Sequence, residues 1–218
     1  MLFELGSALL QLTRYQEAVS VLSAASRASP GEMRFRLQLG FAYYQLVEGE
    51  KAAAEFRAVL GKEPENAAAH FYLGLSEAAL GHLEAAEQSF RNALEQDATL
   101  VDARLGLARV LSQSGRRDEA KTELETVLRV FPAAAASAHN ELGLIALRAG
   151  ETVAAAEHFE AVLALEPEHR QATYNLSLLY RRLDLPEKAE AMRVRFEQLK
   201  TGEVKEPSLA RTTSRKSR

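Results

Sequence analysis

Apolar residues in this chain follow a helical period rather than the alternation expected of strands. Between residues 67 and 80 they fall on one helical face, and Gly81 interrupts the pattern. A second stripe occupies residues 84–96, with apolar side chains at the i, i+4, i+7 and i+8 positions of a half-buried helix. The pattern predicts two helices joined by a short turn. The stripe residues are Leu73, Gly74, Ala78 and Leu80, then Ala86, Phe90, Ala93 and Leu94.

This two-helix pattern recurs every 34 residues, with a single step of 35. Four series of positions keep that period, so the chain is predicted to be a tandem repeat, with the extra residue within 133–136. One series consists of the alanines Ala18, Ala52, Ala86, Ala120, Ala155 and Ala189. Four residues later stand Leu22, Phe56, Phe90, Leu124, Phe159 and Arg193. Small residues of the preceding helix are Gly6, Gly40, Gly74, Ala108, Gly143 and Ser177. The prolines are Pro30, Pro64, Pro132 and Pro167, with Ala98 in the remaining slot.

Glycines and prolines mark the predicted turns. Gly81, Gly115 and Gly150 occupy one slot of their repeats, where a left-handed helix end favours glycine. In the second repeat Gly49 lies two residues later, which predicts a rearranged turn there. The prolines are expected to close the second helix of their repeats, because the residue before a proline is pushed out of helical geometry.

Small residues predict how the helices meet. Gly74 lacks a side chain and Ala86 has only a methyl group, so their two helices can approach closely. Phe90 supplies bulk where neighbouring repeats leave a gap. A lone helix pair has too little core to be stable, so we expect the pairs to stack into one continuous apolar spine.

These residues resemble the tetratricopeptide repeat pattern in type and spacing, and the resemblance implies an all-α, right-handed superhelical solenoid. The usual Trp is absent, and His70 and His139 stand in its place in two repeats. The matching residues are Leu73-Gly74, Ala86, Phe90 and Ala93; Leu39-Gly40, Tyr43, Ala52, Phe56 and Pro64; and Leu142-Gly143, Ala155, Phe159 and Pro167. The resemblance covers residues 1–200 as six repeats, 1–32, 33–66, 67–100, 101–135, 136–169 and 170–200.

Composition narrows the range of functions. The 27 Lys and Arg against 30 Asp and Glu give a net charge of -3, which argues against a basic nucleic-acid-binding or membrane-surface protein. The absence of cysteine excludes disulfides, a thiolate nucleophile and cysteine metal sites. No apolar run approaches the roughly 18 residues that a membrane-spanning helix needs.

The sequence offers no catalytic constellation. Its five histidines lack the HExxH spacing, and no GxxxxGK[ST], GxGxxG or GxSxG motif is present. Glu119, Glu123 and Glu125 lie among basic residues and are interpreted as a solvated helix face, and His82 as an ordinary surface residue. We therefore expect a protein that is not an enzyme, with no metal and no cofactor.

The ends of the repeat region differ. Arg193 stands where earlier repeats have Phe or Leu, which suits a last helix facing water. The segment Asp184-Leu185-Pro186-Glu187 predicts the N-cap region of that helix, with a Pro in the first turn and an acid near the positive helix end. Leu2 already lies in a helical pattern, so either the chain is a fragment of a longer one, which we favour, or something covers its first helix. Residues 201–218 carry a net +3 and predict a disordered basic tail.

Without a positively charged leader a cytoplasmic location is favoured, unless the N-terminus is truncated. The Ala- and Arg-rich composition suggests a bacterial source.

The resemblance also implies a concave groove, lined by the first helices of the repeats, that takes an extended peptide or a partner helix. Apolar contacts are expected towards the N-terminal end. Towards the other end Asn140 and Asn175 offer hydrogen bonds, and Arg109 or Arg181 an ion pair with a carboxylate. Alternatively, Leu37, Leu75 and Leu105 simply pack between helices. The candidate groove residues are Phe3, Leu37, Phe41, Tyr44, Phe71, Tyr72, Leu75, Leu105, Arg109, Asn140, Leu144, Tyr174, Asn175, Leu178 and Arg181.

The function expected from the sequence is that of a protein–protein interaction scaffold or adaptor whose partner is another protein or peptide. The family's clamp for chaperone C-termini uses Lys, Asn and Arg where this chain has Leu37, Phe41 and Phe71, so a chaperone-tail receptor is not expected. One alternative is the repeat arm of a larger enzyme or sensor whose catalytic domain lies upstream. Another is weak binding of nucleic acid or anionic lipid through the basic tail.

Overall fold

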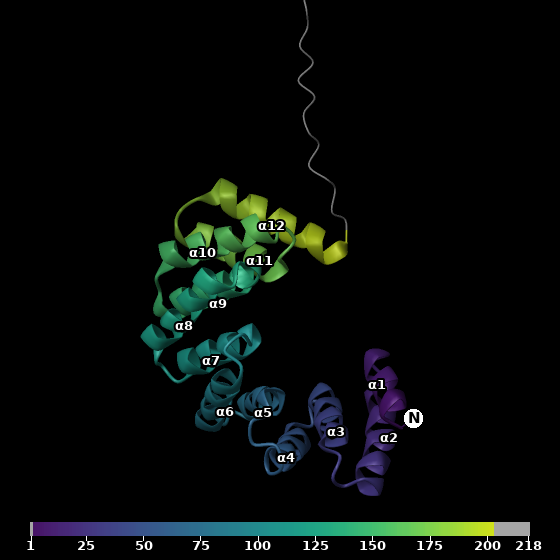
Figure 1. Cartoon of the computed structure of the whole chain (residues 1–218). Coiled ribbons are helices and arrows are strands. Elements are labelled where there is room, and N and C mark those ends of the chain that lie inside the picture. Colours follow the sequence, from purple (N-terminus) through teal and green to yellow (C-terminus); the bar gives the residue numbers. More distant parts are fainter. Residues whose placement is uncertain (1, 203–218) are drawn as a thin grey trace, which may run out of the picture. The chain divides into compact units, whose positions relative to one another are not determined.

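The computed structural model describes residues 2–202, which form twelve α-helices and one short 3-10 helix (Figure 1). No strand occurs among these residues, so the predicted all-α repeat solenoid is confirmed. The predicted basic tail, apart from Thr201 and Gly202, lies outside the described residues. The first helices of the repeats are α1 (Leu2–Gln11), α3 (Met33–Gln45), α5 (Ala67–Ala79), α7 (Val101–Gln113), α9 (Ala135–Ala149) and α11 (Arg170–Arg182). The second helices are α2 (Tyr15–Ala28), α4 (Gly49–Leu60), α6 (Leu83–Gln96), α8 (Arg117–Val130), α10 (Thr152–Leu165) and α12 (Pro186–Thr201).

The chain divides into two compact parts, an N-terminal part up to Glu141 and a C-terminal part from Leu142 onwards. In the N-terminal part each helix from α1 to α8 packs against the next one along the chain. The first helices also contact one another, α1 with α3, α3 with α5 and α5 with α7, so they form a row. In the C-terminal part α11 packs against both α10 and α12.

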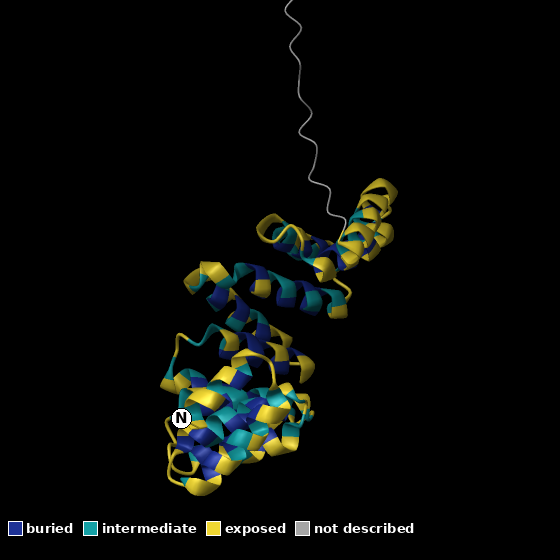
Figure 2. Ribbon diagram, turned by 90° about the vertical axis from the view of Figure 1, so that its right-hand side faces the viewer, coloured by how far each residue is buried: buried dark blue, intermediate teal, exposed yellow. Residues whose placement is uncertain are grey.

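Large side chains of the second helices fill notches left by glycines of the first helices. Phe56, Phe90 and Phe159 are at most 1% exposed and form part of the buried interior shown in dark blue in Figure 2. A methyl group added to Gly74 would lie only 2.8 Å from the Phe90 ring. Gly40 and Phe56 stand in the same relation at 2.7 Å, and Gly143 and Phe159 at 2.9 Å. This close approach explains why glycine and phenylalanine recur together.

The turn between the two helices keeps one backbone geometry even where glycine is absent. Gly81, Gly115 and Gly150 have φ values of 80°, 81° and 77°, which confirms the predicted left-handed ends. The corresponding residues of the other repeats adopt the same region although they carry side chains: Thr13 at 56°, Val47 at 60° and Asp184 at 55°. The prediction of a rearranged second turn was therefore wrong: Val47 holds the left-handed position, and Gly49 begins α4.

The remaining boundaries follow local backbone chemistry. A 3-10 helix, Pro132–Ala134, leads directly into α9 where the extra residue was predicted. Within the predicted N-cap region, Leu185 is the N-cap residue, Pro186 opens α12 and Glu187 lies in its first turn, as expected. Asp184 takes the left-handed turn position before them. Asn66 caps α5 by accepting a hydrogen bond from the Ala69 N–H at 2.9 Å.

Hydrogen-bonded ion pairs, here named polar braces, connect neighbouring helices. Arg104 donates to Glu123 at 2.6 Å between α7 and α8, so Glu123 is a structural partner rather than part of a purely solvated face. The Glu77 side chain is 4% exposed and bridges Arg57 of α4 to His82, whose Nδ1 lies 2.8 Å from the carboxylate. The interpretation of His82 as an ordinary surface residue was therefore incomplete. These braces fix the spacing of helices that apolar packing alone leaves free to slide.

Replacing Val47 by Gly is expected to stabilise the chain by about 1 kcal/mol, because a β-branched residue in the left-handed region is strained. Chemical denaturation followed by circular dichroism measures the change. Asp184→Gly is the comparison variant, and its gain should be smaller because Asp tolerates this region better. A loss of stability in Val47→Gly would contradict the assignment of strain to this turn.

Gly74→Ala is expected to destabilise the chain by about 1–2 kcal/mol, because the clash with Phe90 outweighs the gain in helix propensity. Adding Phe90→Leu should recover part of the loss, since the fourth repeat pairs Ala108 with Leu124 at these positions. The measurement is a double-mutant cycle by chemical denaturation. Gly31→Ala is the control, because a Cβ there meets open space. Strict additivity of the two changes would show that the pair is not coupled.

Candidate functional site

The candidate groove residues lie on the first helices, as the repeat register requires. In the N-terminal part, contacts between successive first helices bring the candidates of α1, α3, α5 and α7 into one row. The C-terminal part contributes Leu144 of α9 and the candidates on α11. The candidates lie on α1 (Phe3), α3 (Leu37, Phe41, Tyr44), α5 (Phe71, Tyr72, Leu75), α7 (Leu105, Arg109), α9 (Asn140, Leu144) and α11 (Tyr174, Asn175, Leu178, Arg181).

Four aromatic side chains gather between α3 and α5. The Tyr72 ring lies edge-on to Phe41 at a centroid distance of 5.4 Å and tilted against Phe71 at 5.0 Å. Tyr44 lies 6.5 Å from the same ring, and Phe56 stacks on Tyr72 from the interior at 5.6 Å. Phe41, Tyr44, Phe71 and Tyr72, here named the aromatic cluster, are all half-buried. Their rings are therefore held rigidly by the core while part of each remains accessible to a partner.

The environment of Tyr72 keeps its hydroxyl protonated. Burial among the neighbouring rings raises the pKa of Tyr72, and the negative charge of Asp102 adds to this effect. Tyr72 therefore remains a neutral hydrogen-bond donor well above neutral pH.

Several candidates are already engaged within the chain. Arg109 donates to Glu141 through Nη2 at 2.7 Å and Nε at 3.2 Å, so its guanidinium has a carboxylate partner on α9. The Arg34 guanidinium covers Phe3 at 4.9 Å from the ring centroid. Leu105 is 8% exposed and Asn175 is 5% exposed, so these side chains offer little surface to a partner.

Besides Gln38 of α3, whose buried Oε1 has no hydrogen-bond partner, two of the candidate amides on the first helices retain unused hydrogen-bonding capacity. The Oδ1 atom of Asn140, in the N-terminal part, is buried and has no hydrogen-bond partner. In the C-terminal part, Asn175 accepts from Gln171 at 3.2 Å, whereas its Nδ2 is buried without a partner. Buried polar groups are rarely left unsatisfied, so these two amides stand out.

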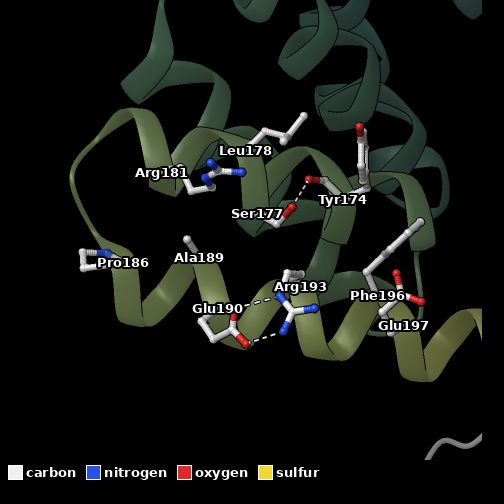
Figure 3. A pocket seen from close by; sticks show the side chains of 10 residues that line it. All are labelled: Tyr174, Ser177, Leu178, Arg181, Pro186, Ala189, Glu190, Arg193, Phe196 and Glu197. Atoms are coloured by element: carbon white, nitrogen blue, oxygen red, sulfur yellow. Dashed lines mark hydrogen bonds and ion pairs between the residues drawn. The ribbon is translucent and has the colours of Figure 1, made fainter.

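A hollow of about 430 Å³ is lined by side chains of the two packed helices α11 and α12 (Figure 3). Tyr174 and Phe196 lie at one end of it, with ring centroids 5.2 Å apart. Arg181 lines the opposite end and has no ion pair among the residues that the structure describes. Between them Arg193 projects from α12 and donates to Glu190 at 2.8 and 2.5 Å. The hollow thus combines apolar walls with a free guanidinium.

Sequence reasoning placed the candidate residues only on first helices and missed the contribution of α12. Phe196 was the available signal, since it follows the buried second-helix positions of the earlier repeats. In earlier repeats that position is covered by the next helix, whereas in the last repeat it borders the hollow. Among residues 2–202, no group of three or more His, Asp or Glu side chains is placed to hold a metal ion.

Comparison with known proteins identifies the class of repeat. A tetratricopeptide repeat model matches residues 9–73 and 77–142, and a second tetratricopeptide repeat model matches residues 48–100 and 154–193. The chain belongs to the tetratricopeptide repeat family, in which the repeat fold is typically non-catalytic. No helix within the described part of the chain has the length and apolar character needed to cross a bilayer.

The chain is similar to one curated relative, cellulose synthase operon protein C of Xanthomonas axonopodis pv. citri, with 29% identity over 208 residues. The alignment covers 86% of this chain but spans only 13% of the length of that relative. Among solved structures, the type IV pilus biogenesis factor PilW aligns with a TM-score of 0.81 at 19% identity, covering 94% of both chains. YrrB, described as a tetratricopeptide repeat protein with an unusual peptide-binding site, aligns with a TM-score of 0.60 at 20% identity, covering 83% of this chain and 92% of its own. Both structural matches concern the fold alone.

Replacing Tyr72 by Phe is expected to leave stability unchanged at pH 8 and to reduce its loss in alkali. A raised pKa in the folded chain contributes stability that is present below the unfolded value of about 10 and is lost as pH rises through the folded value. Thermal unfolding at pH 8, 10 and 11 measures the difference from the unmodified chain. Parallel pH profiles for the two chains would show that the Tyr72 hydroxyl is not desolvated.

Proposed function

We propose that the row of first helices in the N-terminal part binds an apolar segment of a partner protein, with the aromatic cluster as its main contact. The coarser conclusion, that the chain is a protein-interaction scaffold, follows from its repeat family. The proposal goes further by assigning the contact surface. The observation that carries it is the gathering of Phe41, Tyr44, Phe71 and Tyr72 as half-buried rings on two adjacent helices.

Rigid aromatic rings suit this role for energetic reasons. A few aromatic anchors often dominate the binding energy of an interface, and they lose little conformational entropy because the core already orders them. Phe56 supports Tyr72 from behind, and Phe90 lies 6.2 Å from Phe71. A ligand would therefore meet a surface that is ordered before binding.

Polar groups near the row supply orientation rather than most of the affinity. The partner-free Oδ1 of Asn140 is an acceptor that a peptide N–H can satisfy after a small side-chain movement. Arg109 needs an exchange of partners before it can bind a ligand carboxylate, because Glu141 already occupies it. We therefore expect a mainly apolar peptide rather than a strongly acidic one. The peptide-binding site named for YrrB is consistent with this class of ligand.

A second candidate function is that these repeats are the arm of a much longer enzyme or sensor whose catalytic domain lies upstream. The observation that favours it is the match to a curated relative of which the chain spans only 13%. Reading the genomic sequence before Met1 tests this candidate. An in-frame continuation would support it, whereas an in-frame stop close to Met1 would rule it out.

The combined replacement Phe41→Ala and Phe71→Ala is expected to weaken peptide binding at least about tenfold, because aromatic anchors each contribute more than about 1 kcal/mol. Peptides are first selected from a displayed random library with the purified chain. Their affinities are then measured by fluorescence anisotropy. The chain has no Trp, so a Trp-containing peptide can also be followed without background.

The matched control is Val130→Ala with Leu165→Ala, which removes two exposed apolar side chains at the ends of α8 and α10. Circular dichroism establishes that both double variants retain their helices. Equal affinity of both double variants for the selected peptides would overturn the assignment of the aromatic cluster as the binding surface.

A further inference from the structure

The first helix of the chain leaves uncovered a face that every later first helix buries. Leu5 is 49% exposed and Ala8 is also exposed. The five residues in the register of Leu5 are at most 8% exposed, and the five in the register of Ala8 are at most 1% exposed. The first set is Leu39, Leu73, Leu107, Leu142 and Leu176, and the second is Ala42, Ser76, Val110, Ile145 and Leu179.

The buried equivalents show what normally covers this face. Leu39 and Ala42 pack in one apolar cluster with Leu22 and Ala25 of the preceding second helix, α2. In the C-terminal part, Leu176 and Leu179 belong to a cluster that also holds residues of α10. The face that carries Leu5 is thus shaped to lie against the second helix of a preceding repeat.

The last repeat leaves the complementary half of this interface uncovered. Phe196 of α12 is only half-buried and borders the hollow between α11 and α12. Its counterparts in the five earlier repeats are at most 1% exposed. Those counterparts are Ala25, Val59, Ala93, Val127 and Val162.

The two uncovered faces also carry opposite charges at positions that lie opposite each other in the interior repeats. In the interior, Phe56 stacks on Tyr72 of the following first helix, and Phe90 meets Gly106 at the equivalent position of the next one. The residue in the register of Phe56 and Phe90 in the last repeat is Arg193, and the residue in the register of Tyr72 and Gly106 in the first repeat is Glu4. The two ends therefore carry opposite charges at this position, where the second helices of the interior repeats carry Leu or Phe and the first helices carry Gln38, Tyr72, Gly106, Glu141 or Asn175.

We propose that this chain associates with itself head to tail, with α1 of one copy lying in the hollow on α11 and α12 of a second copy. Leu5 and Ala8 then meet the Phe196 side of the hollow. Glu4 of the incoming helix approaches Arg193, which keeps Glu190 as a neighbour. The contact continues the stacking that already joins the repeats within each part of the chain. Because it joins unlike surfaces, the contact is heterologous and is not used up when two copies join.

Sedimentation velocity of the chain 1–218 over increasing concentration tests the proposal. The average mass of the unmodified chain should rise with concentration, and the rise should weaken with added salt. Leu5→Glu blocks the first end, and Phe196→Glu blocks the second end. Each variant alone should remain monomeric. The two variants mixed in equal amounts should form dimers and nothing larger, because each contributes one intact face.

Val194→Glu is the matched control on α12, since Val194 is 43% exposed and does not line the hollow. This control should associate like the unmodified chain. If circular dichroism shows that Phe196→Glu loses helix, Leu178→Glu replaces it, because Leu178 lines the hollow and is already 38% exposed.

Three results would overturn the proposal: a monomer at concentrations up to about 1 mM, equal association of Phe196→Glu and Val194→Glu, or a mixture of the two blocked variants that stays monomeric. A charge exchange adds a positive test. Arg193→Glu should weaken association, and Glu4→Arg in the same chain should restore it, because the double exchange re-creates an opposite-charge pair at the contact between copies. Neither Leu5 nor Phe196 belongs to the aromatic cluster, so failure of self-association leaves the peptide-binding proposal standing.

Discussion

The structure depends on the fit of a bulky second-helix side chain into a gap left by a small residue of the first helix. Phe90 shows why this contact is decisive. Its ring lies within 3 Å of where side-chain atoms of Gly74 and of Gly106 would stand, so one residue joins its own repeat to the next. Interiors packed this closely tolerate little change in volume. A substitution at one such residue therefore disturbs two repeat interfaces rather than one.

Polar contacts refine this packing. Arg36 and Glu55 form an ion pair at 2.9 Å, and Arg104 and Glu123 repeat the same pair 68 residues further along at 2.6 Å. The buried carboxylate of Glu77 differs, because Arg57 of α4 and His82 of the turn before α6 both approach it. Removing one partner of a buried pair costs more than forming the pair gains. Such pairs therefore oppose alternative helix registers more than they add to overall stability.

Much of this architecture is accessible from the sequence because the repeat supplies several independent views of one local structure. The residue types at Gly74, Ala86 and Phe90 are sufficient to place both helices of their repeat. The left-handed turn at Val47 is not predictable in the same way, because valine disfavours that conformation and only the neighbouring repeats impose it.

The candidate surface was predicted less completely than the fold. Register correctly placed Phe41, Phe71 and Tyr72 on adjacent first helices, since helical phase determines the face that each residue occupies. Register cannot show that Arg109 is already paired with Glu141, because that contact depends on side-chain conformations 32 positions apart. It also gives no warning that α12 borders a hollow, since the pattern describes interior repeats, in which the same position is covered.

The short reach of the contacts has a consequence for how such a chain changes over generations. Side-chain hydrogen bonds between the described helices join residues 19 to 32 positions apart, and the first helices α1, α3, α5 and α7 each contact the next first helix in the row. Duplication or loss of about 34 codons within the repeat region would thus recreate junctions that already exist, without requiring new compensating substitutions elsewhere. The number of repeats can therefore change in steps of one whole repeat, and the junctions between the remaining repeats stay of the same kind.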